Sequence, residues 1–169
     1  STEGNQDLPD DGYVDGARTN YAMIKMEEAA NSGKPFFLAV GYTKPHLPFV
    51  APKKYWDLYD RNNISIHPEQ GRDSSIPSIA FHNNHELVNN YSDIPLNGNI
   101  TNDKQKELIH GYKACVSYVD AQVGKLLSKL DELGLSDNTI VVLWGDHGWH
   151  LGDHGLWIKH TNFEQAVSS

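Results

Sequence analysis

TIVVLWGDHGWHLGDHGLWIK, residues 139–159, carries the strongest structural signal in the sequence. Its first five residues form an unbroken apolar, mostly β-branched run, which predicts a fully buried strand because no polar residue alternates within it. A glycine-rich segment with two Asp-His-Gly triplets follows directly. Ligands of open α/β sheets bind just outside the carboxyl ends of strands, and Asp146 falls at such an end.

A second apolar run, FFLAVG at residues 36–41, predicts another buried strand. Between the two runs, residues 101–134 predict a long helix, with Asn102 as its cap and Gly134 at its end. Its apolar residues recur at steps of three and four: Leu108, Tyr112, Cys115, Val119, Val123, Leu126, Leu130 and Leu133. Buried strands separated by helices indicate an α/β fold. We therefore expect strands near 36–41 and 139–144 in one mixed sheet, with the helix packed on it.

The remaining segments are predicted to be shorter or irregular. Residues 1–12 are polar and indicate a loop. Asp15 can cap a helix that runs to about Asn31 and ends at Gly33, with a thin apolar side made of Ala17, Tyr21 and Ile24. Residues 60–100 are rich in Asn, His, Ser and Asp, which predicts a long irregular excursion.

Between these segments, three prolines make residues 42–52 an ordered loop, because proline fixes φ and removes a hydrogen-bond donor. A short helix is predicted over residues 51–59, with Pro52 in its first turn. A rigid loop after a strand is a good mount for a ligand-contacting side chain, so His46 and Lys44 become candidates. The loop residues alone leave open that His46 is a packing histidine.

Composition limits the possible functions. The chain has 169 residues, 38% of them hydrophobic and 21% charged, which is ordinary for one modest globular domain. The net charge of -8 argues against nonspecific binding of nucleic acid. No apolar run approaches the ~18 residues that a membrane helix needs, so no membrane partner is expected. Cys115 is the single cysteine, which excludes an internal disulfide.

The two side chains Asp146 and His147 offer an oxygen and a nitrogen donor on one tight turn, where they can meet one cation. Spacing alone leaves open a glycine-rich turn with ordinary surface histidines.

The pattern Gly-Asp-His-Gly-Trp-x-Leu-Gly-Asp-His-Gly-x-Trp-x-Lys resembles the C-terminal metal motif of the sulfatases, within the alkaline-phosphatase superfamily. In that family the first Asp-His pair binds a divalent cation, usually calcium, and a lysine about a dozen residues later contacts the sulfate. The resemblance implies Asp146 and His147 as metal ligands and Lys159 as a catalytic residue. KPFFLAVGYTKPHLPF, residues 34–49, is similar to the family's segment with a sulfate-contacting histidine, here His46.

The resemblance implies a mostly parallel sheet sandwiched by helices, of the alkaline-phosphatase type. It also implies a sulfuric ester hydrolase that cleaves sulfate esters of a sulfated sugar or glycosaminoglycan. By the same resemblance, the protein is expected to be periplasmic, secreted or lysosomal. Lower-ranked substrate contacts are Lys44, Trp149, His150 and His154. Calcium is the expected cation, although His147 leaves magnesium, manganese or zinc open.

Two parts of the family's site have no counterpart in these 169 residues. The nucleophile motif Cys/Ser-x-Pro-x-Arg, whose first residue becomes formylglycine, does not occur, and Cys115 is expected to be a core residue. The pair Asp10-Asp11 does not follow a strand and is not the family's metal-binding aspartate pair. We therefore expect residues 1–169 to be a fragment of one catalytic domain, incomplete in its sheet, inactive alone and dependent on an N-terminal part.

Two alternatives remain from the residues. A phosphoesterase of the same superfamily can also present Asp-His at this strand end. A non-catalytic metal-binding or carbohydrate-binding module would explain the lack of a nucleophile motif.

Overall fold

The computed structural model describes residues 1–4, 6–96 and 99–168, and it divides the chain into two compact units. One comprises Ser1–Thr2, Asp60–His110 and Val142–Ser169, and is called the motif unit because it contains the Asp-His-Gly triplets. The other comprises Glu3–Tyr59 and Gly111–Val141, and is called the helical unit.

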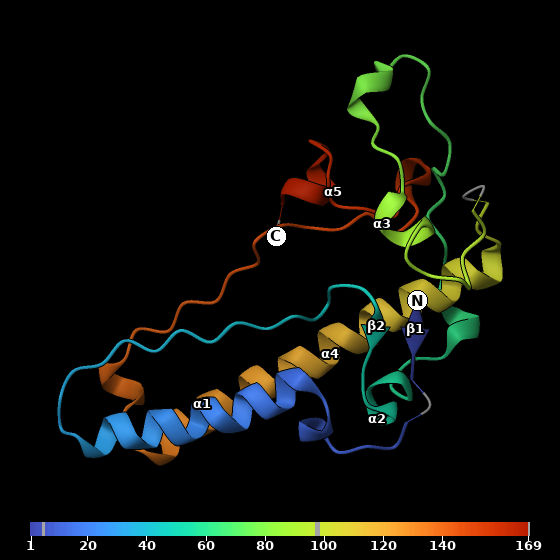
Figure 1. Ribbon diagram of the computed structural model, residues 1–169. Helices are drawn as coiled ribbons and strands as arrows, with labels where there is room; N and C mark the ends of the chain where they lie inside the picture. The colour runs from blue at the N-terminus through green and yellow to red at the C-terminus, as the bar shows by residue number, and fades with distance from the viewer. Residues whose placement is uncertain (5, 97–98, 169) are drawn as a thin grey trace. The chain divides into compact units, whose positions relative to one another are not determined.

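The described secondary structure is mainly helical (Figure 1). The helices are α1 (Val14–Asn31), α2 (Lys53–Trp56), α3 (His85–Val88), α4 (Asn102–Glu132) and α5 (Glu164–Val167). The strands β1 (Thr2–Glu3) and β2 (Phe49–Val50) form a two-stranded sheet. Short 3-10 turns lie at Asp10–Gly12, Arg61–Asn63, Ser78–Ala80, Ser136–Asn138 and Asp153–Gly155. None of the helices in the described ranges is long and apolar enough to cross a membrane.

The two apolar runs do not form the predicted strands. Residues 36–41 and 139–144 follow extended paths without strand pairing, and several of their side chains are exposed, including Phe37 at 93% and Ile140 at 93%. A strand needs a hydrogen-bonded neighbour, and the sheet among the described residues pairs only β1 with β2. The prediction of one sheet containing both runs is therefore wrong for the chain as it stands.

Helix α4 confirms the long helix, and its predicted apolar side is confirmed in part. Leu108, Cys115 and Leu130 are buried, whereas the other five predicted positions are half-buried. Cys115 is fully buried, which confirms its core role, and this burial raises the pKa of the thiol to about 12. The predicted cap was wrong by one residue. The Thr101 hydroxyl, not Asn102, accepts from an amide of the first turn, that of Lys104 at 3.3 Å.

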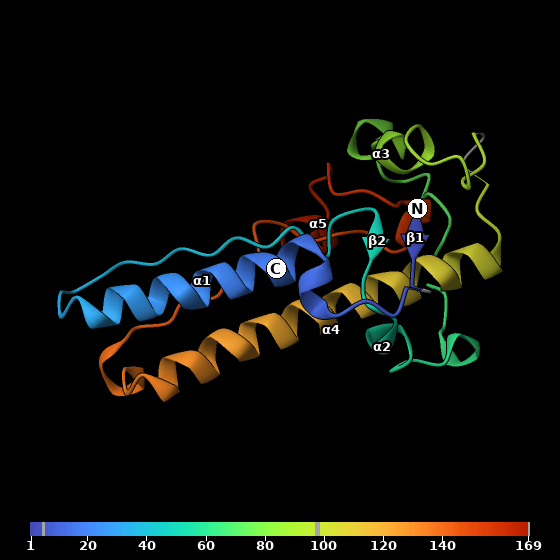
Figure 2. The ribbon, with the colours of Figure 1, turned by 60° about the horizontal axis from the view of Figure 1, so that its bottom comes forward.

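Helix α4 ends beside Gly134, which has a φ of +68° as the sequence predicts. The second half of α4 and α1 lie side by side in the helical unit (Figure 2), where Lys129 pairs with Glu27 at 3.0 Å.

Helix α1 has the predicted extent but not the predicted cap or buried side. Asp15 is 2% exposed, and its carboxylate accepts from the amides of Thr43 and Lys44, both at 2.9 Å. The Asp15 carboxylate, which was predicted to cap α1, therefore binds the backbone of the proline loop instead. Tyr21 and Ile24 of the expected apolar side are exposed, whereas the buried positions are Asp15, Gly16, Thr19, Ala22 and Met26.

The irregular segments agree with expectation, apart from short elements within them. Residues 60–100 contain only α3 and two 3-10 turns, and positions 97 and 98 lie outside the described residues. Residues 1–12 contain β1 and one 3-10 turn, and position 5 lies outside the described residues. The proline loop ends in β2, and the short helix after Pro52 is α2.

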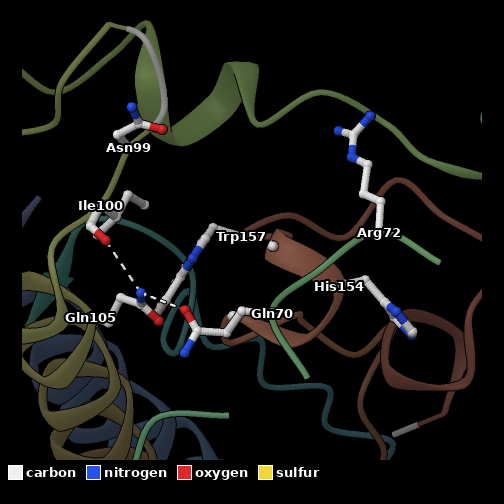
Figure 3. Close-up of a pocket in the computed structure, with 9 residues that line it drawn as sticks. Gln70, Arg72, Asn99, Ile100, Gln105, His154 and Trp157 are labelled. Carbon is white, nitrogen blue, oxygen red and sulfur yellow. Dashed lines mark hydrogen bonds between the residues drawn. The ribbon is translucent and has the colours of Figure 1, made fainter. Parts of the chain in front are cut away.

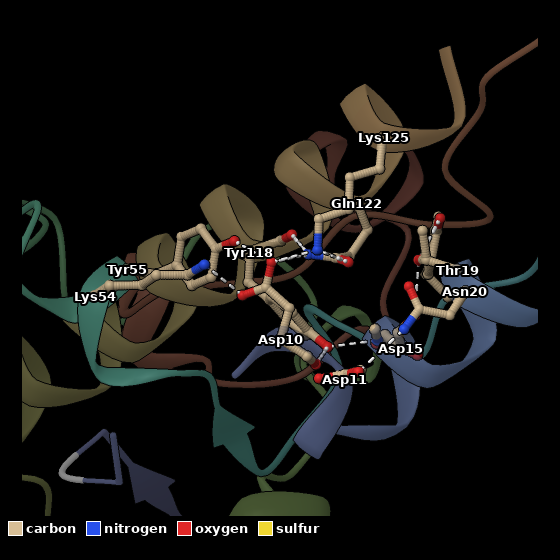
Figure 4. Close-up of polar contacts among 12 residues, drawn as sticks. Asp10, Asp11, Asp15, Thr19, Asn20, Lys54, Tyr55, Tyr118, Gln122 and Lys125 are labelled. Atoms are coloured by element: carbon tan, nitrogen blue, oxygen red, sulfur yellow. Dashed lines mark hydrogen bonds and ion pairs between the residues drawn. The ribbon is translucent and has the colours of Figure 1, made fainter. Parts of the chain in front are cut away.

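Asp10 anchors the first 3-10 turn to the helices of the helical unit (Figure 4). Its carboxylate accepts hydrogen bonds from Tyr55 at 3.0 Å, Gln122 at 3.1 Å and Lys125 at 2.6 Å. Lys54 pairs with its second oxygen at 2.7 Å. Two ammonium groups already neutralise this carboxylate, so it is a structural ion-pair centre and not half of a cation site.

We expect Asp10→Asn to lower the free energy of unfolding by about 2 kcal/mol, because charge-assisted hydrogen bonds contribute about 1.5–3 kcal/mol. Burial alone raises the pKa of Asp10, but the bonds from Lys125, Lys54, Gln122 and Tyr55 outweigh it and hold the pKa far below its usual value. Urea denaturation measures the loss. Asp11→Asn is the matched control, because Asp11 is exposed.

The lowered pKa of Asp10 also determines how the stability of the protein depends on pH. A depressed folded-state pKa stabilises the protein above the unfolded value of about 3.9, and this contribution is lost as pH falls through the folded pKa. Stability of the unsubstituted chain should therefore fall below about pH 4 more steeply than that of Asp10→Asn. Equal acid slopes for the two proteins would contradict the assigned role.

Candidate functional site

The Asp-His-Gly motif folds into a hairpin within the motif unit. The amide of His150 donates to Ile158 O at 3.0 Å, and that of Gly152 donates to Leu156 O at 2.9 Å. The tip is the 3-10 turn Asp153–Gly155, which Gly152 enters with a φ of +104°. A left-handed φ of this size is readily adopted only by glycine. We call residues 146–159 the motif hairpin.

The first arm of the motif hairpin presents Asp146 and His147 to solvent. The Asp146 side chain is 83% exposed, and its carboxylate lies 3.7 Å from His147 Nε2. His147 Nδ1 lies 2.8 Å from Gly148 O. Gly148 is tied to the C-terminal segment, because its amide donates to Ala166 O at 2.8 Å. A Cβ at Gly148 would lie 2.0 Å from Gln165 O, so only glycine permits this approach.

The second arm holds Lys159 in a defined position. Its ammonium pairs with Glu86 of α3 at 2.9 Å, and both side chains are largely buried, at 13% and 18% exposure. The ammonium also lies 5.4 Å from the ring centroid of Trp149, within the range of a cation–π contact. The structure thus brings together two candidates from the sequence, Lys159 and Trp149, and adds Glu86, which was not predicted from the sequence.

His150 joins the two arms from inside. Its ring is fully buried; Nδ1 makes a short hydrogen bond to the Asp153 carboxylate, and Nε2 lies 2.7 Å from Thr161 Oγ1. Burial alone raises the pKa of Asp153, but the hydrogen bond from His150 outweighs it and lowers the pKa. Both ring nitrogens of His150 are engaged within the chain, which suits a positioning role and not direct contact with a substrate.

Asp153 and Thr161 were not predicted from the sequence as partners of His150. The available signal was the spacing of three residues between His150 and Asp153, which allows a side-chain bond across a tight turn. The second triplet's aspartate therefore belongs to the interior of the hairpin, while its histidine, His154, remains partly exposed at the tip.

The donors of Asp146 and His147 suit a divalent cation but form an incomplete set. Calcium typically takes about 6–8 oxygen ligands in proteins. Within residues 1–4, 6–96 and 99–168, no three His, Cys, Asp or Glu side chains are grouped to hold a metal ion. The pair would need further ligands.

His46 and Lys44 belong to the helical unit, on the proline loop. Lys44 Nζ donates to His46 O at 2.9 Å and to Pro48 O at 2.7 Å, so this ammonium holds the loop's own backbone. Burial lowers the pKa of Lys44. The His46 side chain is exposed, with Nδ1 2.8 Å from Leu47 O. The role of His46 as a sulfate contact stays a prediction, as does the expectation that it acts at the same site as Asp146.

Known proteins resemble this chain along almost its whole length. The family described as Sulfatase matches residues 4–168. Iduronate 2-sulfatase of Mus musculus is 41% identical over 166 residues, and that of Homo sapiens is 40% identical over 166 residues. Each alignment covers 95% of this chain but 30% of the relative, so the chain spans under a third of these relatives' length.

A solved structure of another enzyme is similar to this chain in its fold. The phosphonate monoester hydrolase SpPMH from Silicibacter pomeroyi superimposes with a TM-score of 0.77 at 25% sequence identity. The superposition covers 94% of this chain and 32% of that structure. The α/β fold of the alkaline-phosphatase type that the sequence predicts is therefore confirmed at the level of the fold class, although the predicted strands are unpaired here.

Proposed function

The chain belongs to the sulfatase family, and on that premise we propose that the complete protein hydrolyses sulfate monoesters of a carbohydrate. The observation that carries the proposal is the motif hairpin, which combines an exposed Asp-His pair on one arm with an anchored lysine on the other. A sulfate group offers oxygens to a cation and to an ammonium, and both can be held by one such hairpin.

Lys159 would bind a sulfate oxygen and stabilise the negative charge that develops on the ester during cleavage. Its pairing with Glu86 and its position over Trp149 limit its movement, so little ordering remains to be done when substrate binds. His46 would donate a proton to the leaving oxygen, as its place after the 36–41 segment suggests.

Asp146 and His147 would hold a divalent cation, for which we propose Ca²⁺. When bound, the cation would act as a Lewis acid and a template for the sulfate oxygens. Asp146 is suited to this because its carboxylate is exposed and its neighbours leave it accessible. The further ligands and the formylglycine nucleophile would come from residues outside these 169, and the isolated chain is expected to be inactive.

The substrate proposal follows the relatives. The curated relatives that match 95% of this chain are named for the 2-sulfate of iduronate, which is a sulfated uronic acid. We extend to this protein only the broader class, a sulfated sugar or glycosaminoglycan. The net charge of -8 requires that any basic substrate-binding surface be local.

A second candidate is hydrolysis of phosphonate or phosphate esters, favoured by the superposition with a phosphonate monoester hydrolase. The two candidates are separated by measuring kcat/KM of the complete protein for an aryl sulfate, an aryl phosphate and a phenylphosphonate monoester, before and after chelation and with calcium restored. A preference for the sulfate that calcium restores supports the proposal. A preference for either phosphorus ester would replace it with the second candidate, and no turnover of any would favour a binding module.

A further inference from the structure

A cavity of about 360 Å³ lies in the motif unit, beside the tip of the motif hairpin (Figure 3). We propose that it binds an anionic sugar unit, such as a uronate, as a site separate from Asp146 and Lys159. The choice of a carbohydrate as the ligand rests on the proposed function. The volume lies near the lower end of the range for small-molecule sites, about 300–1,000 Å³, which suits one monosaccharide.

Arg72 gives the cavity a positive charge. Its guanidinium lies 5.1 Å from the ring centroid of Phe81 and donates to His82 O at 3.3 Å, so the side chain is held by an aromatic face and a carbonyl. Among the residues that the structure describes, no carboxylate forms an ion pair with it. The neighbouring carboxylate of Asp73 is engaged by Ser75, whose amide and hydroxyl donate to it at 2.8 and 2.7 Å. An anion can therefore bind Arg72 without competing with an internal carboxylate.

His154 lines the same cavity and is held in an uncommon conformation. Its φ is +53°, in the left-handed region that side-chain-bearing residues seldom adopt. Its amide donates to Glu69 O at 2.8 Å, and its ring stacks on Phe163 with centroids 4.9 Å apart. Backbone conformations of this kind persist where the surroundings enforce them, and they concentrate at functional sites. Figure 3 shows His154 on the same side of the cavity as Arg72, with its imidazole directed away from the guanidinium.

The rest of the lining suits a sugar ring. Trp157 supplies a flat apolar wall and is itself 3% exposed. Gln105 is 6% exposed and donates to Gln70 Oε1 at 2.8 Å and to Ile100 O at 3.2 Å. Its own Oε1 is buried without a hydrogen-bond partner, an arrangement that a ligand hydroxyl entering beside it would relieve. A guanidinium, side-chain amides and one aromatic wall can contact the carboxylate, the hydroxyls and the ring face of an acidic sugar.

The test measures the equilibrium binding of glucuronate, glucose and inorganic sulfate to the complete protein. Binding is detected by ligand-observed NMR or by tryptophan fluorescence. None of the three probes contains a sulfate ester, so binding is measured without turnover. We expect glucuronate to bind more tightly than the other two, and Arg72→Gln to weaken glucuronate binding about tenfold, as expected for loss of one charge-assisted contact. Lys106→Gln is the matched control, because it removes the same charge in the same unit from a residue outside the cavity lining.

Each remaining outcome overturns the proposal in a recognisable way. Equal affinity for glucuronate and glucose would remove the anionic requirement, and sulfate binding as tight as glucuronate would reduce the cavity to an anion site. Glucuronate binding that survives Arg72→Gln but is lost in Asp146→Ala would place the ligand at the metal motif instead. In that last case the cavity proposal fails while the proposed hydrolase function stands.

Discussion

Replacing Asp146 with alanine is expected to lower sulfate ester hydrolysis by the complete protein by about 10²–10³-fold, the usual effect of removing one preorganised charged contact. The fold should be unaffected, because the side chain is 83% exposed and contacts mainly its neighbour His147. An exposed carboxylate with no packing role is informative, since a loss of turnover then reports on chemistry and not on stability.

The measurement is kcat/KM for an aryl sulfate over a calcium titration, with thermal unfolding in parallel. Asp146→Asn keeps an oxygen donor without the charge and should lie between alanine and the unsubstituted protein, with a higher calcium requirement. Asp120→Ala removes an exposed carboxylate from the middle of α4 and serves as the control. Turnover within a few-fold of normal in Asp146→Ala would exclude this residue from the metal site.

Features governed by nearby residues could be predicted from the sequence. The periodic apolar positions of α4 and the left-handed glycine that follows it are local signals; the glycine was confirmed, and the apolar positions were confirmed at Leu108, Cys115 and Leu130. Caps were predicted less well, because one polar side chain has several possible partners. Asp15 bonds amides about thirty residues away, at Thr43 and Lys44, and Thr101 displaced Asn102 by a shift of a single position.

The sheet could not be predicted in the same way, because strand pairing is a non-local property. The runs at 36–41 and 139–144 have strand-like composition, but composition supplies no partner, and in this chain neither run is paired. Their exposed apolar side chains, Phe37 and Ile140 among them, show the difference between a segment that favours a strand and one that has formed it.

In the candidate site, too, contacts between nearby residues could be predicted from the sequence and contacts between distant residues could not. The motif hairpin was identified because its donors are close together in sequence. The partner of Lys159 was not, since Glu86 lies 73 residues away in an irregular segment without a recognisable pattern. Similarly, His150 was a candidate substrate contact by residue type, and only its burial and its two side-chain partners reveal that it is directed inward.

Because His150 is directed inward, His150→Ala is the second substitution with a large expected effect. We expect it to lower the local stability of the motif hairpin by about 3 kcal/mol. Removing the ring leaves the Asp153 carboxylate buried, at 4% exposure, without its partner, and such orphaned charges cost about 3–5 kcal/mol. We take the low end because the Leu151 amide still donates to Asp153 at 3.2 Å. Hydrogen exchange at the amides of residues 150 and 152, which bond across the hairpin, measures the loss.

A double substitution tests whether the orphaned charge is the cause. Asp153→Asn in the His150→Ala background removes the charge that His150 compensated, so it should restore about 1 kcal/mol or more although it deletes a second native group. His160→Ala is the control, since His160 is exposed in the same segment. Turnover should fall together with hairpin protection, because Thr161 connects His150 to the arm that carries Lys159. If the double variant exchanges faster than His150→Ala, packing of the imidazole and not charge compensation holds the hairpin together.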